Sequence, residues 1–423
     1  MKKNILQYIL RIITIKIIKK YNPKIIAITG SVGKTSTKDA IYTVLSNKIK
    51  ARKSSGNLNS EVGAPLVFIG FNKTPKNIKD WTVIILKGIF LIFLKDKNYP
   101  KLIISELAAD KPGDISYLVG FIKPNIGIIT AVGDTPVHIK FYKNSEELAK
   151  EKSNIFSFFS ALNTAIINRD DAHYNTIKNS INSSSQIITF GFNKDADVCI
   201  TNFSITSNRT ASVKLKYKKN EYSIILNNCL DESFAYISAI VFATLIALKL
   251  NLNEFINEIS KIRPSLGRLN LIKGINNSLI LDGSYNAAPL SMKSALHTLS
   301  RIGGKRKIGV IGDMLELGSY EEKEHQKIGE LAGSFCDFIF AVGKNSQIIK
   351  KHALLSKINK KNTFAFSKSE EIIPLLKKII KPGDIILIKG SQGVRTEKIV
   401  YAIMKNKTKA SKTLVRQSNF WKR

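Results

Sequence analysis

The chain has 423 residues, 44% of them hydrophobic and 23% charged, a composition that excludes a disordered or fibrous protein and predicts roughly two or three domains. Its formal net charge is +34, but the lysines are spread along the whole chain without a basic block. We therefore attribute the charge to a bias in residue usage and expect no nucleic-acid partner. Three cysteines, Cys199, Cys229 and Cys336, stand far apart without a CxxC pair, which supports neither a disulfide framework nor a zinc site and fits the cytoplasm best.

The first 23 residues are basic and rich in isoleucine. Arg11 and Lys16 interrupt this apolar run and no small-residue cleavage site follows, so the segment predicts neither a signal peptide nor a membrane-spanning helix. A second apolar stretch, "WTVIILKGIFLIFL" from Trp81 to Leu94, is too short to span a membrane and contains Lys87. Two interpretations stay open for both segments: a helix packed on a core, or a helix lying on the inner membrane surface with lysines beside its apolar face.

From Lys24 onward, short runs rich in isoleucine and valine alternate with helical patterns. The runs are "KIIAITG", "KLIISELAAD", "NIGIITAVG" and "NTAIINRDD". Continuous apolar runs that are separated by helices predict a parallel sheet covered on both faces. Residues 185–230 instead alternate polar and apolar side chains between turn signals, which predicts a small antiparallel patch.

A second α/β unit begins near residue 265, where "KIGVIGDM", "FIFAVG" and "DIILIKGSQG" again alternate with helical patterns. The predicted fold class is therefore α/β, with a phosphate-loop domain built on a central parallel sheet and then a smaller Rossmann-like domain. The expected divisions are a basic apolar segment at 1–23, a central ATP-binding domain at 24–264, a C-terminal domain at 265–405 and a basic tail at 406–423.

The stretch "IIAITGSVGKTSTKDAI", residues 25–41, is typical of a phosphate-binding loop between a strand and a helix, although Ile28 stands at the usual first glycine position and Gly30 follows it. Glycines in the turn let backbone N–H groups face a phosphate, and the N-terminus of the helix adds partial positive charge. We predict an ATP site in which Lys34 reaches the β- and γ-phosphates and the Thr35 hydroxyl holds Mg²⁺. The residues expected to bind ATP here are Gly30, Ser31, Val32, Gly33, Lys34, Thr35 and Ser36.

The shifted form T-G-x-x-G-K-T-S resembles the loop of the Mur ligase family, ATP-dependent enzymes that join amino acids to peptidoglycan precursors. The stretch "SELAADKPGDISYL" resembles a family segment whose glutamate binds the Mg²⁺ between the terminal phosphates, which implies this role for Glu106. His138 stands where the family has a histidine that coordinates a second Mg²⁺, although the three residues before it depart from the family pattern. By themselves, Glu106 would be a helix cap or a solvated charge and His138 an ordinary loop residue.

Lys152 lies in "SEELAKEKSNIF", where Ser145 is the expected N-cap of a helix. Lys150 and Lys152 are only two residues apart, so they cannot share one face of that helix. The run from Lys152 to Phe156 resembles the family pattern K-x-x-[IL]-[FY], whose lysine is carbamylated by CO₂ in relatives and helps to hold the second metal. That chemistry needs a neutral amine, which a desolvated site near other cations favours. The residues alone would indicate a solvated helix lysine, so carbamylation of Lys152 stays open.

Motifs of the second unit extend the resemblance. In "PSLGRLNLI", Arg268 stands where a family arginine reaches a phosphate of ATP, and a forked cation suits a transferring phosphoryl group. The stretch "LILDGSYNAAPLSMKSALHTL" resembles a signature that contacts the nucleotide, which implies this role for Asp282, Tyr285 and Asn286. The stretches "GVIGDMLELGSYEEKEHQKIGELA" and "ILIKGSQGVRTEKIV" resemble the branch that adds D-alanyl-D-alanine, and the first implies substrate binding by Asp313.

The stretch "GNLNSEVGAPL" resembles the loop that lines the family's substrate site, which implies substrate binding by Asn57 and Asn59. Members of this branch have a separate first domain that holds a UDP-linked sugar, whereas only 29 residues precede Gly30 here. We expect that this domain is lacking, and how a UDP-sugar would be bound stays open.

The resemblance implies an ATP-dependent ligase that adds D-alanyl-D-alanine to a UDP-linked muramyl tripeptide. The substrate carboxylate would attack the γ-phosphate of ATP, and the amine would then displace phosphate from the acyl phosphate. The expected catalytic residues are Lys34, His138, Lys152 and Arg268, and the expected ligands of two Mg²⁺ ions are Thr35, Glu106, His138 and Lys152.

Two alternatives to this activity stay open. One is a related Mur-type or polyglutamate-type amide ligase that uses another carboxylate, and the other is a non-catalytic, membrane-associated ATP-binding protein. The expected protein is a cytoplasmic monomer whose partners are small molecules, and a peripheral contact with the inner membrane surface stays open.

Overall fold

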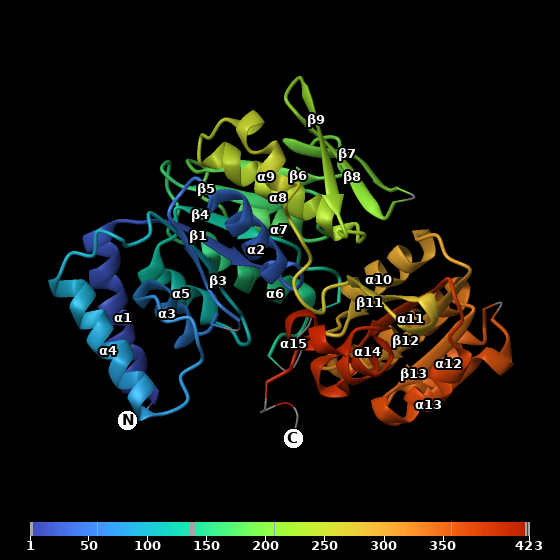
Figure 1. Cartoon of the computed structure of the whole chain (residues 1–423). Coiled ribbons are helices and arrows are strands. Elements are labelled where there is room, and N and C mark those ends of the chain that lie inside the picture. Colours follow the sequence, from blue (N-terminus) through green and yellow to red (C-terminus); the bar gives the residue numbers. More distant parts are fainter. Residues whose placement is uncertain are drawn as a thin grey trace. The chain divides into compact units, whose positions relative to one another are not determined.

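A computed structural model describes residues 3–56, 58–135, 141–206, 208–356, 358–418 and 421 (Figure 1). The chain divides into two compact units. The first unit comprises Met1–Asn202, Val213–Ile224 and Ala235–Ile262, and the second comprises Phe203–Ser212, Ile225–Phe234 and Arg263–Arg423.

The described part of the chain before residue 228 forms one nine-stranded sheet, in the order β2-β3-β1-β4-β5-β6-β7-β8-β9. Its strands are β1 (Lys24–Thr29), β2 (Ala51–Lys53), β3 (Leu102–Glu106), β4 (Ile126–Ile129), β5 (Thr164–Asn168), β6 (Gln186–Gly191), β7 (Val198–Ile205), β8 (Thr210–Tyr217) and β9 (Asn220–Asn227). Neighbouring strands from β2 to β7 pair in parallel. The parallel sheet predicted from the four apolar runs is confirmed.

The prediction of a separate antiparallel patch at 185–230 is wrong for its first strand. Strand β6 pairs in parallel with β5 and β7, so it continues the central sheet. Thr189 interrupts the apolar run of β6 and yet is buried, because its hydroxyl donates a 2.7 Å hydrogen bond to Asp197. Strands β8 and β9 are sheet neighbours separated by two residues, a connection that only an antiparallel pair allows.

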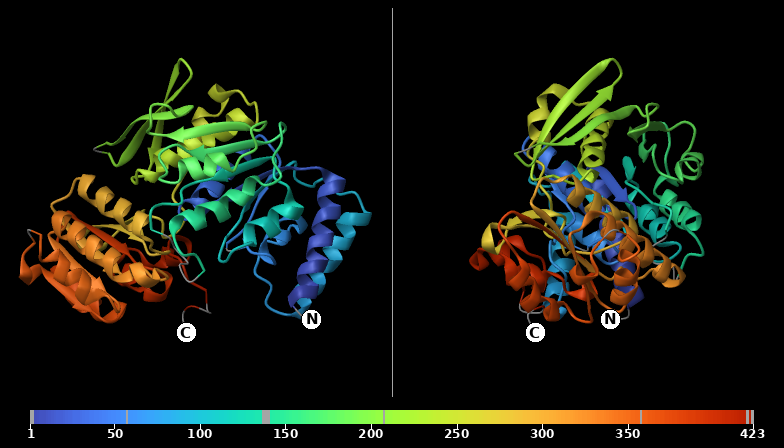
Figure 2. Two further views of the ribbon diagram at one scale, coloured as in Figure 1. Left: turned by 180° about the vertical axis from the view of Figure 1, so that it is seen from behind. Right: turned by 90° about the vertical axis from the view of Figure 1, so that its right-hand side faces the viewer.

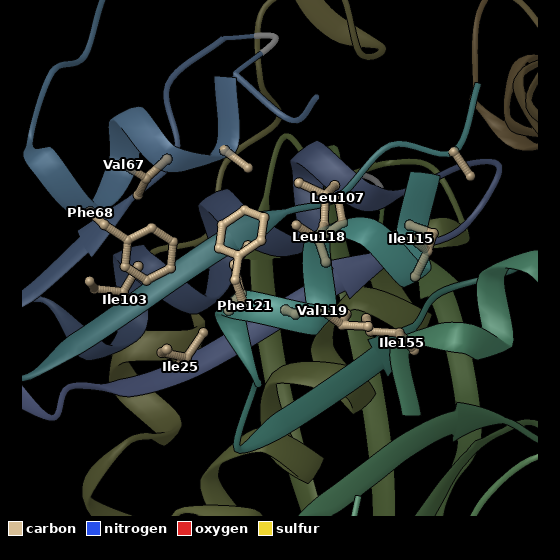
Figure 3. Close-up of a cluster of buried hydrophobic side chains, with 14 of the residues drawn as sticks. Ile25, Val67, Phe68, Ile103, Leu107, Ile115, Leu118, Val119, Phe121 and Ile155 are labelled. Carbon is tan, nitrogen blue, oxygen red and sulfur yellow. The ribbon is translucent and has the colours of Figure 1, made fainter. Parts of the chain in front are cut away.

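Helices cover this sheet. They are α1 (Lys3–Tyr21), α2 (Lys34–Leu45), α3 (Gly63–Ile69), α4 (Ile78–Phe93), α5 (Asp114–Ile122), α6 (Ser145–Ser153), α7 (Tyr174–Asn179), α8 (Ser233–Ala247) and α9 (Ile256–Ile259), with short 3-10 helices η1 (Asn154–Phe156) and η2 (Leu252–Glu254). Figure 3 shows part of the core between this sheet and its helices, where Phe68 of α3 lies beside Ile103 of β3, and Phe121 of α5 and Ile25 of β1 belong to the same cluster. This packing holds the ends of β1 and β3 in place beside each other.

The two apolar segments near the N-terminus are helices α1 and α4. Figure 1 and the left view of Figure 2 show them side by side along much of their length. Leu10, Ile13 and Ile17 of α1, with Ile84 and Leu91 of α4, join the same buried cluster as the sheet.

Among the described residues, no helix combines the length and the apolar character needed to cross a membrane.

The second unit has its own six-stranded sheet in the order β10-β11-β15-β12-β13-β14, counted over the described residues. Its strands are β10 (Asn270–Lys273), β11 (Leu279–Gly283), β12 (Arg306–Gly312), β13 (Phe338–Val342), β14 (Thr363–Phe366) and β15 (Asp384–Lys389). Strand β10 is antiparallel to β11, and the remaining neighbours are parallel. Its helices are α10 (Pro289–Arg301), α11 (Glu321–Phe335), α12 (Ser346–Ala353), α13 (Ser369–Ile379), α14 (Glu397–Ile403) and α15 (Ala410–Thr413), with 3-10 helices η3 (Ile275–Asn277), η4 (Gly318–Tyr320), η5 (Lys360–Asn362), η6 (Gln392–Val394) and η7 (Lys407–Lys409). The predicted Rossmann-like α/β unit is confirmed.

Candidate active site

The glycine turn after β1 is fixed against the end of β4. Gly30 has a φ of 143°, and a Cβ atom there would lie 2.1 Å from Oγ1 of Thr130, so only glycine fits. The Ser31 N–H donates to the carbonyl of Ala131 at 2.7 Å, and the Thr130 hydroxyl donates to the carbonyl of Val32 at 2.6 Å. No local pattern predicted Thr130, because it lies 98 residues from Val32 in the chain.

Helix α2 begins directly at this turn, with Gly33 as its N-cap at a φ of 83°. No side chain caps the helix, so its first N–H groups remain available to an anion, and Thr35 and Ser36 lie in this first turn. The Lys34 ammonium donates to the carbonyl of Gly30 at 2.6 Å, across the turn. The buried Oγ of Ser31 has no hydrogen-bond partner among the described residues. A glycine cradle, a lysine and an unsatisfied hydroxyl fit a bound phosphate group.

Glu106 ends β3 beside this turn, because its strand pairs with β1 in a register that sets Ile28 next to Glu106. The side chain is buried, and its Oε2 accepts a 3.0 Å hydrogen bond from the Thr35 hydroxyl. Oε2 also lies 3.3 Å from Nζ of Lys38, and Oε1 accepts from the Asn59 side chain at 3.3 Å. The structure therefore brings together Thr35, Glu106 and Asn59, which the sequence could only propose separately.

Lys38 is the site cation that sequence analysis missed. It is 1% exposed, and its ammonium forms an ion pair with Glu106, in which both side chains are buried. The available signal was its position one helical turn after Lys34, because residues four apart share a helix face. Removing one partner of such a buried ion pair strongly destabilises a protein, because the other charge is left buried without compensation.

Lys152 is buried on α6, with 2% of its surface exposed, whereas Lys150 is exposed and pairs with Glu146 at 3.1 Å. The prediction that these two lysines occupy different helix faces is confirmed. Burial, together with the nearby charge of Lys34, lowers the pKa of Lys152 to about 7. Lys152 is thus a desolvated amine and not a solvated helix lysine.

The predicted N-cap of α6 is wrong by one residue. Asn144, not Ser145, is the N-cap, and its side-chain carbonyl accepts a 2.9 Å hydrogen bond from the N–H of Glu147. The Glu147 carboxylate in turn accepts from the N–H of Lys143 at 2.9 Å. An asparagine and a serine are comparable caps, so the local sequence did not distinguish them.

Glu151, next to Lys152, links α6 to the stretch that follows Glu106. Its carboxylate accepts the backbone N–H groups of Gly113 and Ile115, each at 3.0 Å, at the start of α5. This contact was not predicted, because its local signal is no more than an acidic residue beside a lysine. Glu151 fixes the orientation of the helix that carries Lys152.

Two proposed site residues, Asn57 and His138, lie outside the described residues. The described part of the chain contains no group of three His, Cys, Asp or Glu side chains that could hold a metal ion. The contacting oxygens of Thr35 and Glu106 nevertheless fit Mg²⁺, which prefers hydroxyl and carboxylate ligands.

In the second unit, the stretches that resemble family motifs lie at the carboxyl ends of the neighbouring strands β11, β15 and β12. Ser391, after β15, connects them: its N–H donates to the Asp313 carbonyl at 2.9 Å and its hydroxyl donates to the Ala287 carbonyl at 3.2 Å. The same hydroxyl accepts the N–H of Leu315 at 3.0 Å. Ligands of open α/β sheets bind at this edge.

Asp313, proposed for substrate binding, is 3% exposed. Its carboxylate accepts the backbone N–H groups of Lys344 and Asn345 at 2.7 and 3.0 Å, at the start of α12. Gly343 makes room for it, since a Cβ at Gly343 would lie 2.3 Å from Asp313 Oδ2. The carboxylate holds the loop after β13 in this structure.

Arg268 and Tyr285, both proposed for nucleotide contacts, lie together. The guanidinium carbon of Arg268 is 4.3 Å from the centre of the Tyr285 ring, and the Tyr285 N–H donates to the Gly267 carbonyl at 3.1 Å. Arg416, from the C-terminal tail, donates to the carbonyls of Ser284 and Tyr285. The expected basic tail is thus partly packed against this motif.

Asp282 is fully buried in the second unit. Its Oδ1 accepts the Ser284 N–H at 3.0 Å, while Oδ2 has no partner among the described residues, and burial raises the pKa of Asp282 to about 6. Nearby, the backbone carbonyl of Asn286 accepts a 2.8 Å hydrogen bond from the Lys389 ammonium. Burial and the charge of Arg268 lower the pKa of Lys389 to about 8.

Known families and structures resemble this chain over most of its length. The model of the Mur ligase middle domain matches residues 28–228, and that of the Mur ligase glutamate ligase domain matches residues 267–392. A UDP-N-acetylmuramoyl-tripeptide--D-alanyl-D-alanine ligase of Rickettsia prowazekii is 30% identical over 383 residues, 89% of this chain and 77% of the relative. The enzyme of that name from Escherichia coli is 29% identical over 395 residues, 91% of this chain and 78% of the relative.

Solved structures of enzymes called MurF resemble this chain as well. MurF from Acinetobacter baumannii aligns with a TM-score of 0.78 and 25% identity, covering 94% of this chain and 80% of the other. MurF from Thermotoga maritima, solved with ADP, has the same fold, with a TM-score of 0.76 and 22% identity over 93% of this chain and 82% of the other.

The chain therefore belongs to the Mur ligase family of ATP-dependent amide ligases. Within the family it belongs to the branch of UDP-N-acetylmuramoyl-tripeptide--D-alanyl-D-alanine ligases. The resemblance stated from the sequence motifs is confirmed.

Proposed function

We propose that this protein joins D-alanyl-D-alanine to UDP-N-acetylmuramoyl-tripeptide at the expense of ATP, the activity that the names of its relatives state. The observation that carries the proposal is the buried carboxylate of Glu106, held by Thr35, Lys38 and Asn59 beside the glycine turn. Binding of ATP alone does not require a carboxylate at this position, whereas a carboxylate here can hold the Mg²⁺ that assists phosphoryl transfer.

In the proposed reaction, the glycine turn and the N-terminus of α2 bind the phosphates of ATP. Lys34 would exchange its contact with the Gly30 carbonyl for the β- and γ-phosphates. The tripeptide carboxylate attacks the γ-phosphorus, ADP leaves, and an acyl phosphate forms. The amine of D-alanyl-D-alanine then adds to the acyl carbon, loses a proton and displaces phosphate to form the amide. We assign Arg268 to the same developing phosphoryl charge, since a guanidinium binds phosphate oxygens in pairs.

Thr35 and Glu106 would hold one Mg²⁺, and Lys152 with His138 a second; bound Mg²⁺ neutralises charge on the transferring phosphoryl group. Burial of Lys152 supports its assignment to the site, because a surface lysine would have no reason to lose its hydration. We propose that Lys152 is carbamylated when the second ion is bound. Glu151 positions it through the start of α5.

The remaining assignments are proposals of the same kind. Asn59 lies in contact with Glu106, which supports a place for Asn57 and Asn59 near the muramyl substrate. We also propose a substrate role for Asp313 and nucleotide contacts for Asp282, Tyr285 and Asn286. We further propose domains at 24–264 and 265–405, a monomeric state and a cytoplasmic location, where ATP is available.

One assay tests this function. Purified protein receives UDP-N-acetylmuramoyl-tripeptide, D-alanyl-D-alanine, ATP and Mg²⁺, and phosphate release is followed together with dipeptide incorporation. We expect both products in equal amounts, and neither with the variant Lys34→Met. Phosphate release with a different carboxylate or amine only would support a related ligase. ATP binding without phosphate release for any carboxylate would support the non-catalytic alternative.

A further inference from the structure

Helix α4 exposes a continuous apolar face. Val83, Leu86, Phe90 and Phe93 follow helical spacing and are 54%, 60%, 51% and 77% exposed, and Ile89 lies among them at 42%. We call these five residues the α4 apolar face. The opposite side of α4, with Ile84, Gly88 and Leu91, is buried. A helix with one buried side normally turns polar residues to water, so this second apolar side indicates a binding surface.

The α4 apolar face is held rigidly. Helices α1 and α4 approach so closely that a Cβ at Gly88 would lie 2.7 Å from Cγ2 of Ile13. The ammonium of Lys20 donates to the carbonyls of Leu91, Ile92 and Leu94 at 3.0, 2.9 and 2.8 Å, which satisfies the C-terminal end of α4. The exposed side chains therefore belong to a capped, packed helix, and their exposure does not come from a frayed end.

The segments that form and flank helices α1 and α4 are strongly basic. Residues 1–24 contain seven Lys and Arg and no Asp or Glu, and residues 71–97 contain six Lys and two Asp. Of the two acids, Asp80 accepts the N–H of Lys76 and Asp96 accepts the N–H of Asn98, both at 2.7 Å. Lys79, in the first turn of α4, is exposed on the side of the apolar face. The α4 apolar face thus belongs to a part of the chain with a large excess of positive charge.

We propose that the α4 apolar face docks on an anionic membrane surface, with α4 in the plane of the interface. Apolar side chains would enter the boundary of the acyl chains while lysines of the basic segments contact lipid phosphates. The 16 residues of α4 extend about 24 Å along the surface. A second copy of this chain is a poor occupant, because it would bring an equal excess of positive charge to the same place. The proposal is independent of the ligase reaction.

Sedimentation with vesicles tests the proposal on the full chain. We expect binding to phosphatidylcholine vesicles that contain roughly one third phosphatidylglycerol, weaker binding at high salt, and little binding to phosphatidylcholine alone. The triple variant Leu86→Ser, Phe90→Ser, Phe93→Ser should lose about tenfold or more in affinity. The matched apolar control is Leu162→Ser, a residue that is 92% exposed elsewhere in the first unit, and it should bind as the unsubstituted protein does.

Charge and fold are controlled separately. Lys79→Glu should weaken vesicle binding several-fold, whereas Lys219→Glu, at an exposed turn between β8 and β9, should not. Circular dichroism and thermal unfolding report whether the variants fold. Equal vesicle binding by the folded triple variant would overturn the proposal. So would a dimer in light scattering that the triple variant abolishes, because a second copy would then cover the face, or specific capture by an acidic protein without vesicle binding.

Discussion

The Thr35 hydroxyl donates a 3.0 Å hydrogen bond to Oε2 of Glu106 and so joins the first turn of α2 to the end of β3. The two residues are 71 positions apart, and the parallel pairing of β1 with β3 brings them together. A hydroxyl in contact with a carboxylate, beside a phosphate-binding turn, is an oxygen pair suited to a hard divalent cation.

Glu106→Gln should reduce the turnover of the folded ligase about a hundredfold, because the amide keeps the shape of the carboxylate but loses the charge that is proposed to hold Mg²⁺. Phosphate release at saturating substrates measures turnover. The control is Glu254→Gln, since Glu254 is exposed and its carboxylate makes surface contacts, an ion pair with Lys48 at 3.1 Å and a hydrogen bond from Asn251 at 3.3 Å. Unchanged turnover of Glu106→Gln would contradict the metal assignment.

Lys38→Met should lower the free energy of unfolding by about 3–5 kcal/mol, because it leaves the Glu106 carboxylate buried without its cation. Urea titration followed by circular dichroism measures this loss. The double variant Lys38→Met, Glu106→Gln should regain part of it, since no buried charge then lacks a partner. Lys48→Met removes an exposed ion pair and should change stability by no more than about 1 kcal/mol. A loss in Lys38→Met no larger than that of the control would show that the buried pair is not stabilising.

Gly30→Ala should weaken ATP binding at least about tenfold and destabilise the protein by about 1–3 kcal/mol, because the new Cβ collides with Thr130 and alanine is strained at this φ. The distance of that Cβ from Oγ1 of Thr130 would be 2.1 Å. Adding Thr130→Ala should recover part of the stability. Gly303→Ala, where a Cβ meets no atom within 4 Å, is the control. Fluorescent-nucleotide titration measures the affinity, and normal ATP binding by Gly30→Ala would rule out the steric argument.

Asp282 should make the stability of the protein depend on pH in the acid range. Its pKa is about 6 in the folded state against an ordinary value of 3.8, so its contribution to stability is complete below pH 3.8 and is lost as the pH rises through 6. Relative to Asp282→Asn, the free energy of unfolding should therefore fall by up to about 3 kcal/mol between these limits. Urea titrations at several pH values measure it, with exposed Asp195→Asn as the control. Parallel pH profiles for the protein and for Asp282→Asn would refute the prediction.

Local patterns were enough for the fold class, the strand–turn–helix at the phosphate loop and the family. Each of these depends on contiguous residues: Gly30 and Gly33 adopt the positive φ values that a tight turn requires, and the apolar runs become buried parallel strands. The separation of Lys150 from Lys152 also follows from helical periodicity alone. The continuation of the parallel sheet into β6 does not follow from a local pattern. The polar Thr189 can be buried there because it donates a hydrogen bond to Asp197, which lies outside the strand.

Tertiary structure alone decided which polar groups meet at the candidate site. Lys38 and Glu106 are 68 positions apart, and Thr130 reaches the glycine turn from the end of β4, so no local pattern links them. It also decided which side of α4 faces water, because the composition of that helix is apolar on both sides and its packing against α1 and α3 buries one of them. Burial is a property of the folded chain. It determines how the charged side chains of the candidate site behave and which apolar side of α4 stays exposed.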